Sequence, residues 1–311
     1  MGACHHMLKH YGTYGIPIRY EHILDSQYCD LITSNFNTAT LARDAKFSDV
    51  IVWHDNKYAI NQSAITKIAA ISNWCTNNNI KLSGGNILTL LPDFLPKGIL
   101  HTSNLEVVGR VYFEYFYTLI EKFPGMVWHI NELFMPDGSV RQSILKSAIE
   151  VYTGKSFLQA ITDWMEDSGC KFLWCDYRLQ DIARWQSVLE SINSDSVVGV
   201  GIQCHHQVPW MSQNQVLEGL TYVIDSTKRR GLSVEISEVS FMGRNRLGER
   251  QLCAGAYQPL FKVAGKIPVT FWAFHDGLPF PSPVAECGLF DARLQPTVIY
   301  DSILTTIQEM V

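Results

Sequence analysis

The amino-acid sequence predicts a single (β/α)8 barrel that occupies residues 1–311 as one domain. Short apolar runs that end in polar residues alternate with stretches of helical periodicity, which is typical of repeated βα units. A chain of 311 residues has the length at which this barrel forms one domain. An open, doubly wound sheet would alternate strands and helices in the same way. We favour the closed barrel because neither a G-x-G-x-x-G motif after the first strand nor a P-loop is present.

The apolar runs and the helical pattern place the expected elements along the chain. A first strand is expected at Met1–His5, and further strands are expected to end near Asn35, Gly84, Glu132, Asp176, Gln203, Glu238 and Asp276. Amphipathic helices are expected at Gln62–Asn77, Val140–Ser168, Asp181–Asn193, Gln213–Arg230 and Arg250–Ala264. The active site of such a barrel lies at the carboxyl ends of its strands. One rim should therefore carry Glu132, Asp176, Gln203, His205, Glu238 and Asp276.

Composition limits the classes of partner. The net charge of −5 and the pI near 6.0 provide no basic face for a polyanion, so we expect no nucleic-acid partner. The longest apolar stretches are far shorter than the roughly 20 residues that span a bilayer, so no membrane span is expected. The eight cysteines are scattered singly, which indicates buried thiols rather than a disulfide scaffold. The N-terminus lacks a secretory signal pattern, so the protein is expected to be extracellular if a signal peptide was removed and otherwise cytoplasmic. We also expect a monomer.

Two predicted strands end in a carboxylate. Met126 begins a run that closes with Asn131-Glu132, and Val234 begins one that closes with Glu238. Glycoside hydrolysis through a covalent intermediate needs a protonated carboxyl group to donate to the leaving oxygen and an ionised one to attack the anomeric carbon. Burial and hydrogen bonding decide which group takes which role. A carboxylate at a strand end is also common as a helix cap or an ion-pair partner.

Glu235 competes with Glu238 for the role of nucleophile. It lies three positions earlier in the same strand, where strand alternation directs its side chain to the opposite face. We therefore assign the nucleophile to Glu238 and the general acid/base to Glu132.

Several short segments, in the same order along nearly the whole chain, resemble glycoside hydrolase family ten, the endo-β-1,4-xylanases and related β-glycanases. Asn131-Glu132 is similar to the acid/base motif of that family, and Ile236-Ser237-Glu238 to its nucleophile strand. The other similar segments are Asp137-Gly138 with Arg141 and Ser143, Phe172–Tyr177, Gly199–His205, Thr270–Trp272 with Asp276, and Leu289–Asp291 with Gln295-Pro296.

The resemblance implies a role for each matching position. Asn131 would hydrogen-bond the 2-hydroxyl of the sugar at the cleavage site, and Lys46 would contact a sugar beside it. His205 would keep Glu238 ionised, Gln203 would support that network, and Trp272 would form an apolar wall under the sugar. An imidazole donor does favour a carboxylate anion, and an aromatic face stacks well on a pyranose. Tyr177 and Trp210 follow rim strands and are further candidates for sugar contact, with packing in the core as the alternative for both.

Some positions depart from the family pattern. Ala42 and Arg43 stand where the family has a Glu-Asn pair that binds the glycone, and Gly85 and Thr89 where it has a His and a Trp. Ser240 replaces an acidic residue, and Cys175 an Asn. Lost sugar contacts should weaken the enzyme or mark a different glycan. The guanidinium of Arg43 would suit an acidic or substituted sugar, although a solvated surface arginine is the plainer interpretation.

The sequence thus predicts a retaining glycoside hydrolase of β-1,4-linked, xylan-like polysaccharide or oligosaccharide that needs no cofactor and no metal. The consecutive His205 and His206 point to opposite faces of a strand, which argues against a shared zinc ion. One alternative is a barrel that binds glycans without cleaving them, because part of the glycone subsite is missing. A metal-dependent amide or ester hydrolase is a third hypothesis.

Overall fold

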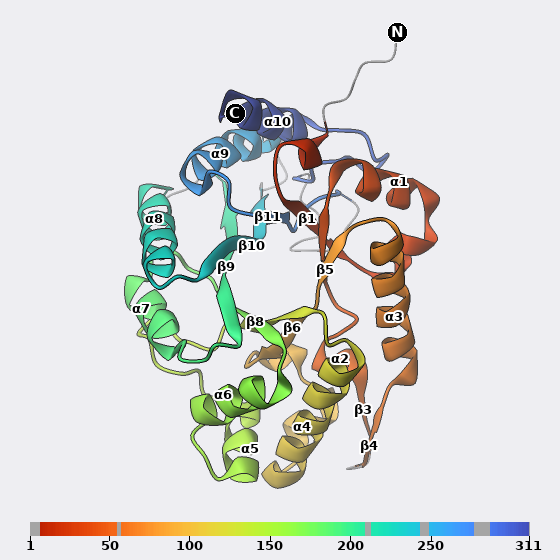
Figure 1. Ribbon diagram of the computed structural model, residues 1–311, viewed down its shortest axis with the longest axis vertical. Helices are drawn as coiled ribbons and strands as arrows, with labels where there is room; N and C mark the ends of the chain where they lie inside the picture. The colour runs from red at the N-terminus through yellow and green to blue at the C-terminus, as the bar shows by residue number, and fades with distance from the viewer. Residues whose placement is uncertain (1–6, 55–56, 209–212, 243–248, 277–286, 311) are drawn as a thin grey trace.

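The computed structural model describes residues 7–54, 57–208, 213–242, 249–276 and 287–310 and shows a ring of parallel strands surrounded by helices (Figure 1). The main sheet consists of β1 (Tyr14–Ile18), β2 (Thr38–Leu41), β5 (Lys81–Ser83), β6 (Gly85–Thr89), β7 (Val127–Asn131), β8 (Lys171–Asp176), β9 (Val197–Gln207), β10 (Ser233–Met242) and β11 (Val269–Phe271). Its strand order is β5-β2-β1-β11-β10-β9-β8-β7-β6, and all neighbours are parallel.

The ring closes through a broken strand at Gly84 and Gly85. β5 pairs with β2 and β6 pairs with β7, yet β5 and β6 are separated in the chain by Gly84 alone. Gly85 has a φ of +68°, and a Cβ atom there would collide with the carbonyl oxygen of Leu41. Because β5 and β6 together form one interrupted strand of the barrel, the described strands make eight barrel strands, here called staves. The predicted (β/α)8 barrel is confirmed.

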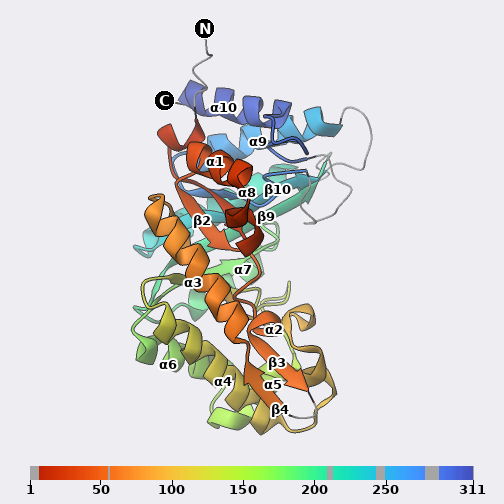
Figure 2. The same cartoon turned by 90° about the vertical axis from the view of Figure 1, so that its right-hand side faces the viewer.

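The helices lie outside the ring (Figures 1 and 2). They are α1 (Ser26–Asn35), α2 (Phe47–Val50), α3 (Gln62–Asn77), α4 (Leu105–Lys122), α5 (Ile144–Thr153), α6 (Phe157–Ser168), α7 (Ile182–Ser191), α8 (Gln213–Arg229), α9 (Glu249–Ala264) and α10 (Val298–Met310). Short 3-10 helices are η1 (Leu8–His10), η2 (Tyr20–Leu24), η3 (Pro92–Phe94) and η4 (Lys97–His101). β3 (Ile51–His54) and β4 (Lys57–Ile60) form an antiparallel hairpin beside α2. No described helix has the length and apolar character needed to cross a membrane.

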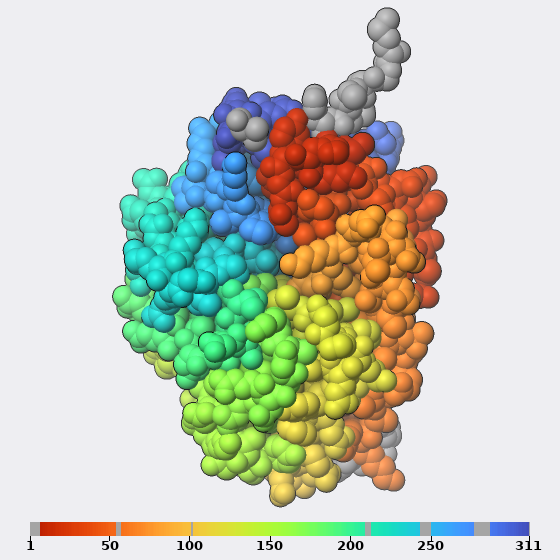
Figure 3. Space-filling model, in the orientation of Figure 1, coloured from red at the N-terminus to blue at the C-terminus, as the bar shows by residue number. Residues whose placement is uncertain are grey.

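The last helix lies against the first elements of the chain. In Figure 3, α10 in dark blue lies beside the red N-terminal segment. The hydroxyl of Tyr300 on α10 donates to Oδ1 of Asn35 at the end of α1, at 2.7 Å. Packing between α10 and α9 completes the helical layer on this side. The first and last helices of the described chain therefore lie on the same side of the barrel.

Two predicted elements in the N-terminal part are not as expected. The strand predicted to end near Asn35 is wrong, because Ser26–Asn35 is helix α1, whose first turn is capped by the Asp25 side chain accepting from the Gln27 amide at 2.9 Å. The strand in this region is β2, which follows α1. The first strand of the barrel, β1, was not predicted, because it contains a glycine and a proline that obscure the strand pattern. The predicted strand at Met1–His5 lies outside the described residues.

The predicted helix Val140–Ser168 is two helices. Gly154 ends α5 in the left-handed conformation with φ of +67°, and its amide donates to the Glu150 carbonyl at 2.9 Å. The Glu150 side chain then accepts from the Phe157 amide at 3.2 Å, which fixes the start of α6. The helix predicted at Gln62–Asn77 has the observed bounds of α3.

A register shift in β10 changes the expected position of Glu235. Glu235 pairs with Gly201 and Glu238 with Gln203, so three steps along β10 match two along β9. The alternation used to place these carboxylates on opposite faces is therefore wrong. Glu235 lines a cavity of about 190 Å³ near the amino ends of the staves, among residues such as Thr13, Ser233 and Pro268. Glu238 lines a different pocket, so depth along the strand distinguishes the two.

Replacing Glu235 with Gln is expected to flatten the decline of stability with rising pH. Burial raises the pKa of Glu235 from 4.5 to about 7, so the folded state binds this proton more tightly than the unfolded state. The stabilisation is complete below pH 4.5 and is lost as the pH rises through 7. Between about pH 5 and 8 the wild type should lose on the order of 3 kcal/mol of unfolding free energy that the variant retains. Denaturant titrations at several pH values measure this.

Glu218→Gln is the matched control, because Glu218 is exposed on α8. This variant should keep the wild-type dependence on pH. Parallel stability curves for the wild type and Glu235→Gln would contradict the assignment.

Candidate active site

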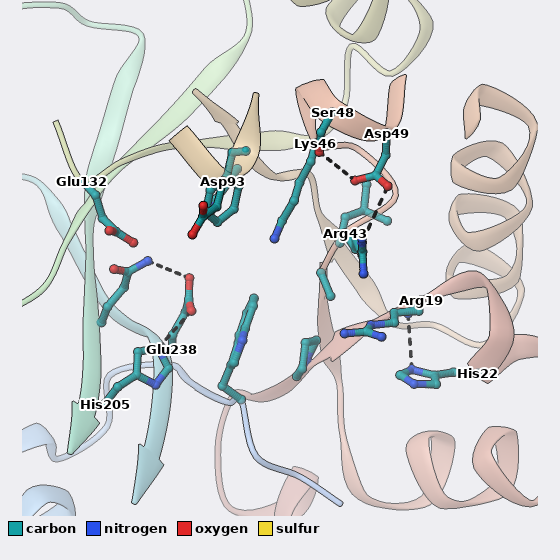
Figure 4. Close-up of a pocket in the computed structure, with 17 residues that line it drawn as sticks. Arg19, His22, Arg43, Lys46, Ser48, Asp49, Asp93, Glu132, His205 and Glu238 are labelled. Carbon is teal, nitrogen blue, oxygen red and sulfur yellow. Dashed lines mark hydrogen bonds and ion pairs between the residues drawn. The ribbon is translucent and has the colours of Figure 1, made fainter. Parts of the chain in front are cut away.

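A pocket of about 410 Å³ opens at the carboxyl ends of the staves. Figure 4 shows the carboxylates of Glu132 and Glu238 directed into the same part of this pocket. Among the predicted site residues, seven line this pocket: Arg43, Lys46, Glu132, Gln203, His205, Glu238 and Trp272. They come from strands and loops spread from β2 to β11, so the closed barrel is what brings them together.

Glu238 is held by two donors on the neighbouring stave. Glu238 on β10 is buried, with 5% of the residue exposed. Oε1 accepts from Nε2 of Gln203 at 2.7 Å, and Oε2 is 3.1 Å from Nε2 of His205. Gln203 and His205 are two residues apart on β9, so they share the inward face. Both contacts favour the carboxylate anion over the protonated acid.

Ser240 orients the imidazole of His205. Its hydroxyl lies 2.7 Å from Nδ1 of His205, on the ring side opposite Glu238. Contacts at both ring nitrogens therefore fix the orientation of the His205 imidazole beside Glu238.

Glu132 occupies an unusual backbone position. It follows the last residue of β7 with a φ of +58°, which is left-handed and costly for a residue other than glycine. Its amide donates to the Cys175 carbonyl on β8 at 3.0 Å, and its own carbonyl accepts from Nε of Arg141 at 3.4 Å. These contacts fix the turn that directs the side chain into the pocket.

The surroundings of Glu132 favour its protonated form. Burial, followed by the charges of Glu238 and Asp176, raises its pKa from 4.5 to about 7, although Arg184 and Arg141 act in the opposite direction. No hydrogen-bond donor to its carboxylate comparable to those on Glu238 is found among the described residues. The two acids of the pocket therefore differ, since Glu132 favours its protonated form up to about neutral pH while the carboxylate of Glu238 is hydrogen-bonded on both oxygens.

A buried ion pair lies behind Glu132. Asp176, at the end of β8, accepts from Nε of Arg184 at 2.7 Å and from the Tyr177 amide at 2.7 Å. Both charged side chains are fully buried, and burial raises the pKa of Asp176 to about 6 despite the opposing effect of Arg184. Asp176 therefore acts on the pocket through its charge rather than by contact.

Two other predicted site residues lie elsewhere. Asn131 is buried beneath Glu132, and neither polar atom of its amide has a partner among the described residues. Tyr177 does not line the pocket, because its ring faces the Arg184 guanidinium at 4.1 Å. Trp210 lies outside the described residues. Asp276, expected on the rim, accepts from Arg250 at 2.6 Å and from the Gly288 amide at 2.8 Å, as a structural acceptor would.

Several polar residues of the pocket were not predicted from the sequence. They are Arg19, His22, Ser48, Asp49, Asn86 and Asp93. Arg19 directly follows β1 and shares the inward face with Pro17, two residues earlier. Correct placement of the first stave would have identified it. In the described part of the chain, no group of three or more His, Cys, Asp or Glu side chains is arranged to hold a metal ion.

Comparison with known proteins adds an independent observation. The sequence profile of Glycosyl hydrolase family 10 matches residues 3–306. Native xylanase 10B from Thermotoga maritima superimposes with a TM-score of 0.79 at 17% identity, over 98% of this chain and 98% of that one. Endo-1,4-β-xylanase XylE from Penicillium canescens gives 0.78 at 16% identity over 97% and 96%. The endo-1,4-β-xylanase from Caldicellulosiruptor owensensis gives 0.75 at 20% identity over 95% and 97%. At such identities, structural likeness shows the fold.

Removing the charge of Glu238 is expected to lower the pKa of Glu132. Only burial contributes more to the elevation, so Glu238→Gln should shift the Glu132 titration toward lower pH. Carbon-13 NMR of labelled glutamate carboxyl groups can follow this titration, with the Glu132 signal identified by its loss in Glu132→Gln.

Glu235→Gln is the control, because Glu235 does not contribute to the raised pKa of Glu132. An unchanged Glu132 titration in Glu238→Gln, or a wild-type Glu132 that titrates near 4.5, would contradict the electrostatic coupling of the pair.

Proposed function

Because the chain belongs to glycosyl hydrolase family 10, we propose that it cleaves β-1,4-linked glycans by double displacement, with Glu132 as general acid/base and Glu238 as nucleophile. It is a glycoside hydrolase, similar to endo-1,4-β-xylanases. The observation that carries the proposed mechanism is the contrast between the two carboxyl groups of one pocket. One is hydrogen-bonded by Gln203 and His205, and the pKa of the other is raised to about 7.

In the first step, Glu132 donates its proton to the glycosidic oxygen as the bond from that oxygen to the anomeric carbon breaks. One carboxylate oxygen of Glu238 forms a bond to the anomeric carbon from the opposite face. Each oxygen of Glu238 accepts one hydrogen bond, which leaves a lone pair for the attack. The leaving sugar departs with the proton, and Glu132 is left ionised.

In the second step, the ionised Glu132 takes a proton from a water molecule as the water oxygen bonds to the anomeric carbon. The bond to Glu238 breaks, and both carboxyl groups return to their starting states. Two inversions at the same carbon give a product with the original β configuration. A pKa near 7 suits a group that must donate in one step and accept in the next.

Xylan or a related β-1,4-glycan is the proposed substrate class. The xylanases similar in structure support this choice, and one of them, the intracellular xylanase of Thermoanaerobacterium saccharolyticum, was solved as a mutant with xylotetraose. Trp272 and Lys46 line the pocket at positions suited to an apolar sugar face and a sugar hydroxyl.

Substitution of each glutamate should have a different effect on substrates with different leaving groups. Glu132→Gln should lower kcat/KM on xylo-oligosaccharides by roughly 10²–10⁴-fold, but far less on a dinitrophenyl xylobioside, whose leaving group needs no proton. Glu238→Gln should abolish both activities, on the order of 10⁴-fold or more. Proton NMR of the first product should show the β anomer.

The matched control is Glu235→Gln, which changes an acid of the same strand outside this pocket. It should cleave both substrates at rates close to the wild type. A wild type that releases no sugar from any β-1,4-glycan, or a first product in the α configuration, would overturn the proposal.

A further inference from the structure

The side of the pocket away from Glu132 is lined by cations. Arg19, Arg43 and Lys46, here called the cationic wall, direct their charged ends into one open space (Figure 4). The carboxylates of Glu132, Glu238 and Asp93 lie across from them in the same view. The pocket therefore has an acidic half, where the reaction is proposed to occur, and a cationic half beside it.

Two of these cations lack a carboxylate partner. In the described part of the chain, no carboxylate lies within ion-pair distance of Arg19 or Lys46. The ammonium group of Lys46 lies 4.0 Å from the centre of the Phe94 ring, and burial lowers the pKa of Lys46. A buried ammonium group such as that of Lys46 is costly unless anions compensate it, and Glu238 and Asp49 do so only from beyond ion-pair distance.

The remaining charges do not neutralise the wall. Nε of Arg43 is 3.6 Å from Asp49, and the side chain of Arg43 is 65% exposed at the rim. This exposure agrees with the interpretation of Arg43 as a solvated surface arginine. Because Arg43 also lines the pocket, it stays available to a ligand. His22 adds no charge near neutral pH, because burial and the neighbouring Arg19 lower its pKa to about 4. Among the described residues, Asp49 is the carboxylate within ion-pair distance of the wall, and Glu238 acts on Lys46 from further away.

The proposed chemistry determines which part of the substrate meets this wall. Glu132 protonates the leaving oxygen, so the leaving sugar lies on the Glu132 side, and the sugars kept on the enzyme extend away from it. That direction leads past Glu238 to the cationic wall (Figure 4). A neutral sugar would not need these charges, whereas a planar guanidinium pairs with a carboxylate through two parallel hydrogen bonds.

We propose that the pocket selects β-linked glycans whose non-reducing side, at the first or second sugar from the cleaved bond, carries the carboxylate of a hexuronic acid. Arg19 and Arg43 bind this carboxylate, and Lys46 adds charge from above Phe94. This inference rests on the proposed function and names the substrate class of that same site.

Matched donors test the proposal. They are 4-nitrophenyl β-glycosides of xylose, glucose and glucuronic acid, and of the disaccharides that carry each of these sugars β-1,4-linked to xylose. The monosaccharide donors form one series and the disaccharide donors form the other. In at least one of these two series, kcat/KM for the glucuronosyl donor should exceed kcat/KM for the glucosyl donor by about tenfold, which is the effect of one charge-assisted hydrogen bond. High salt should reduce this preference, because the wall is partly exposed.

The double variant Arg19→Gln/Arg43→Gln separates the wall from the reaction. It should lower kcat/KM for glucuronosyl donors by about tenfold more than for neutral donors. Arg110→Gln is the surface control, because Arg110 is exposed on α4 and does not line the pocket. It should change neither value.

The outcomes distinguish this inference from the proposed function. Cleavage of neutral donors at least as fast as glucuronosyl donors, or an equal loss on all donors in the double variant, overturns the inference and leaves the proposed function intact. A stronger preference for a 6-sulfated glucosyl donor overturns the assignment to a carboxylate. If no donor is cleaved, the proposed function fails. Calorimetry then compares the binding of glucuronosyl-xylose and xylobiose to Glu132→Gln. Tighter binding of xylobiose would overturn the inference.

Discussion

The site depends on one constraint, which is that two carboxyl groups in a single cavity must have opposite protonation preferences. Hydrogen bonds from Gln203 and His205 stabilise the anion of Glu238. Burial and the negative charge of Glu238 itself raise the pKa of Glu132 to about 7. The two groups are therefore coupled, because the negative charge that the proposed nucleophile Glu238 requires also helps to keep the proton on Glu132. The rest of the pocket is arranged around this pair.

The barrel meets this constraint through local departures from regular backbone geometry. The break at Gly84 and Gly85 lets one stave pair on both sides and close the ring. A register shift between Glu235 and Glu238 brings both acids of β10 to cavities at different depths. The left-handed backbone of Glu132 directs its side chain over the end of β7. Such irregular positions cost free energy, and they are found where a functional site must orient a particular group.

Much of the fold and part of the site could be predicted from the sequence. Strands such as Val127–Asn131 and Lys171–Asp176 are continuous apolar runs, and their polar ends indicate the rim directly. Tyr14–Ile18 was missed because its glycine and proline obscure the strand pattern, and Arg19 was missed with it. The face of Glu235 was predicted wrongly because strand alternation cannot foresee an inserted residue. Arg184, which neutralises Asp176 from a helix, depends on tertiary packing that local patterns do not encode.

The central claim is that Glu238, and not another carboxylate of the barrel, attacks the anomeric carbon. A 2-deoxy-2-fluoro glycoside with an activated leaving group slows the second step and traps the glycosyl-enzyme, and mass mapping of the labelled peptide then locates the bond. The account predicts a single label on Glu238, absent from protein in which that residue is glutamine. A label on Glu235 or on Glu132, or a trapped sugar elsewhere in the chain, would contradict it.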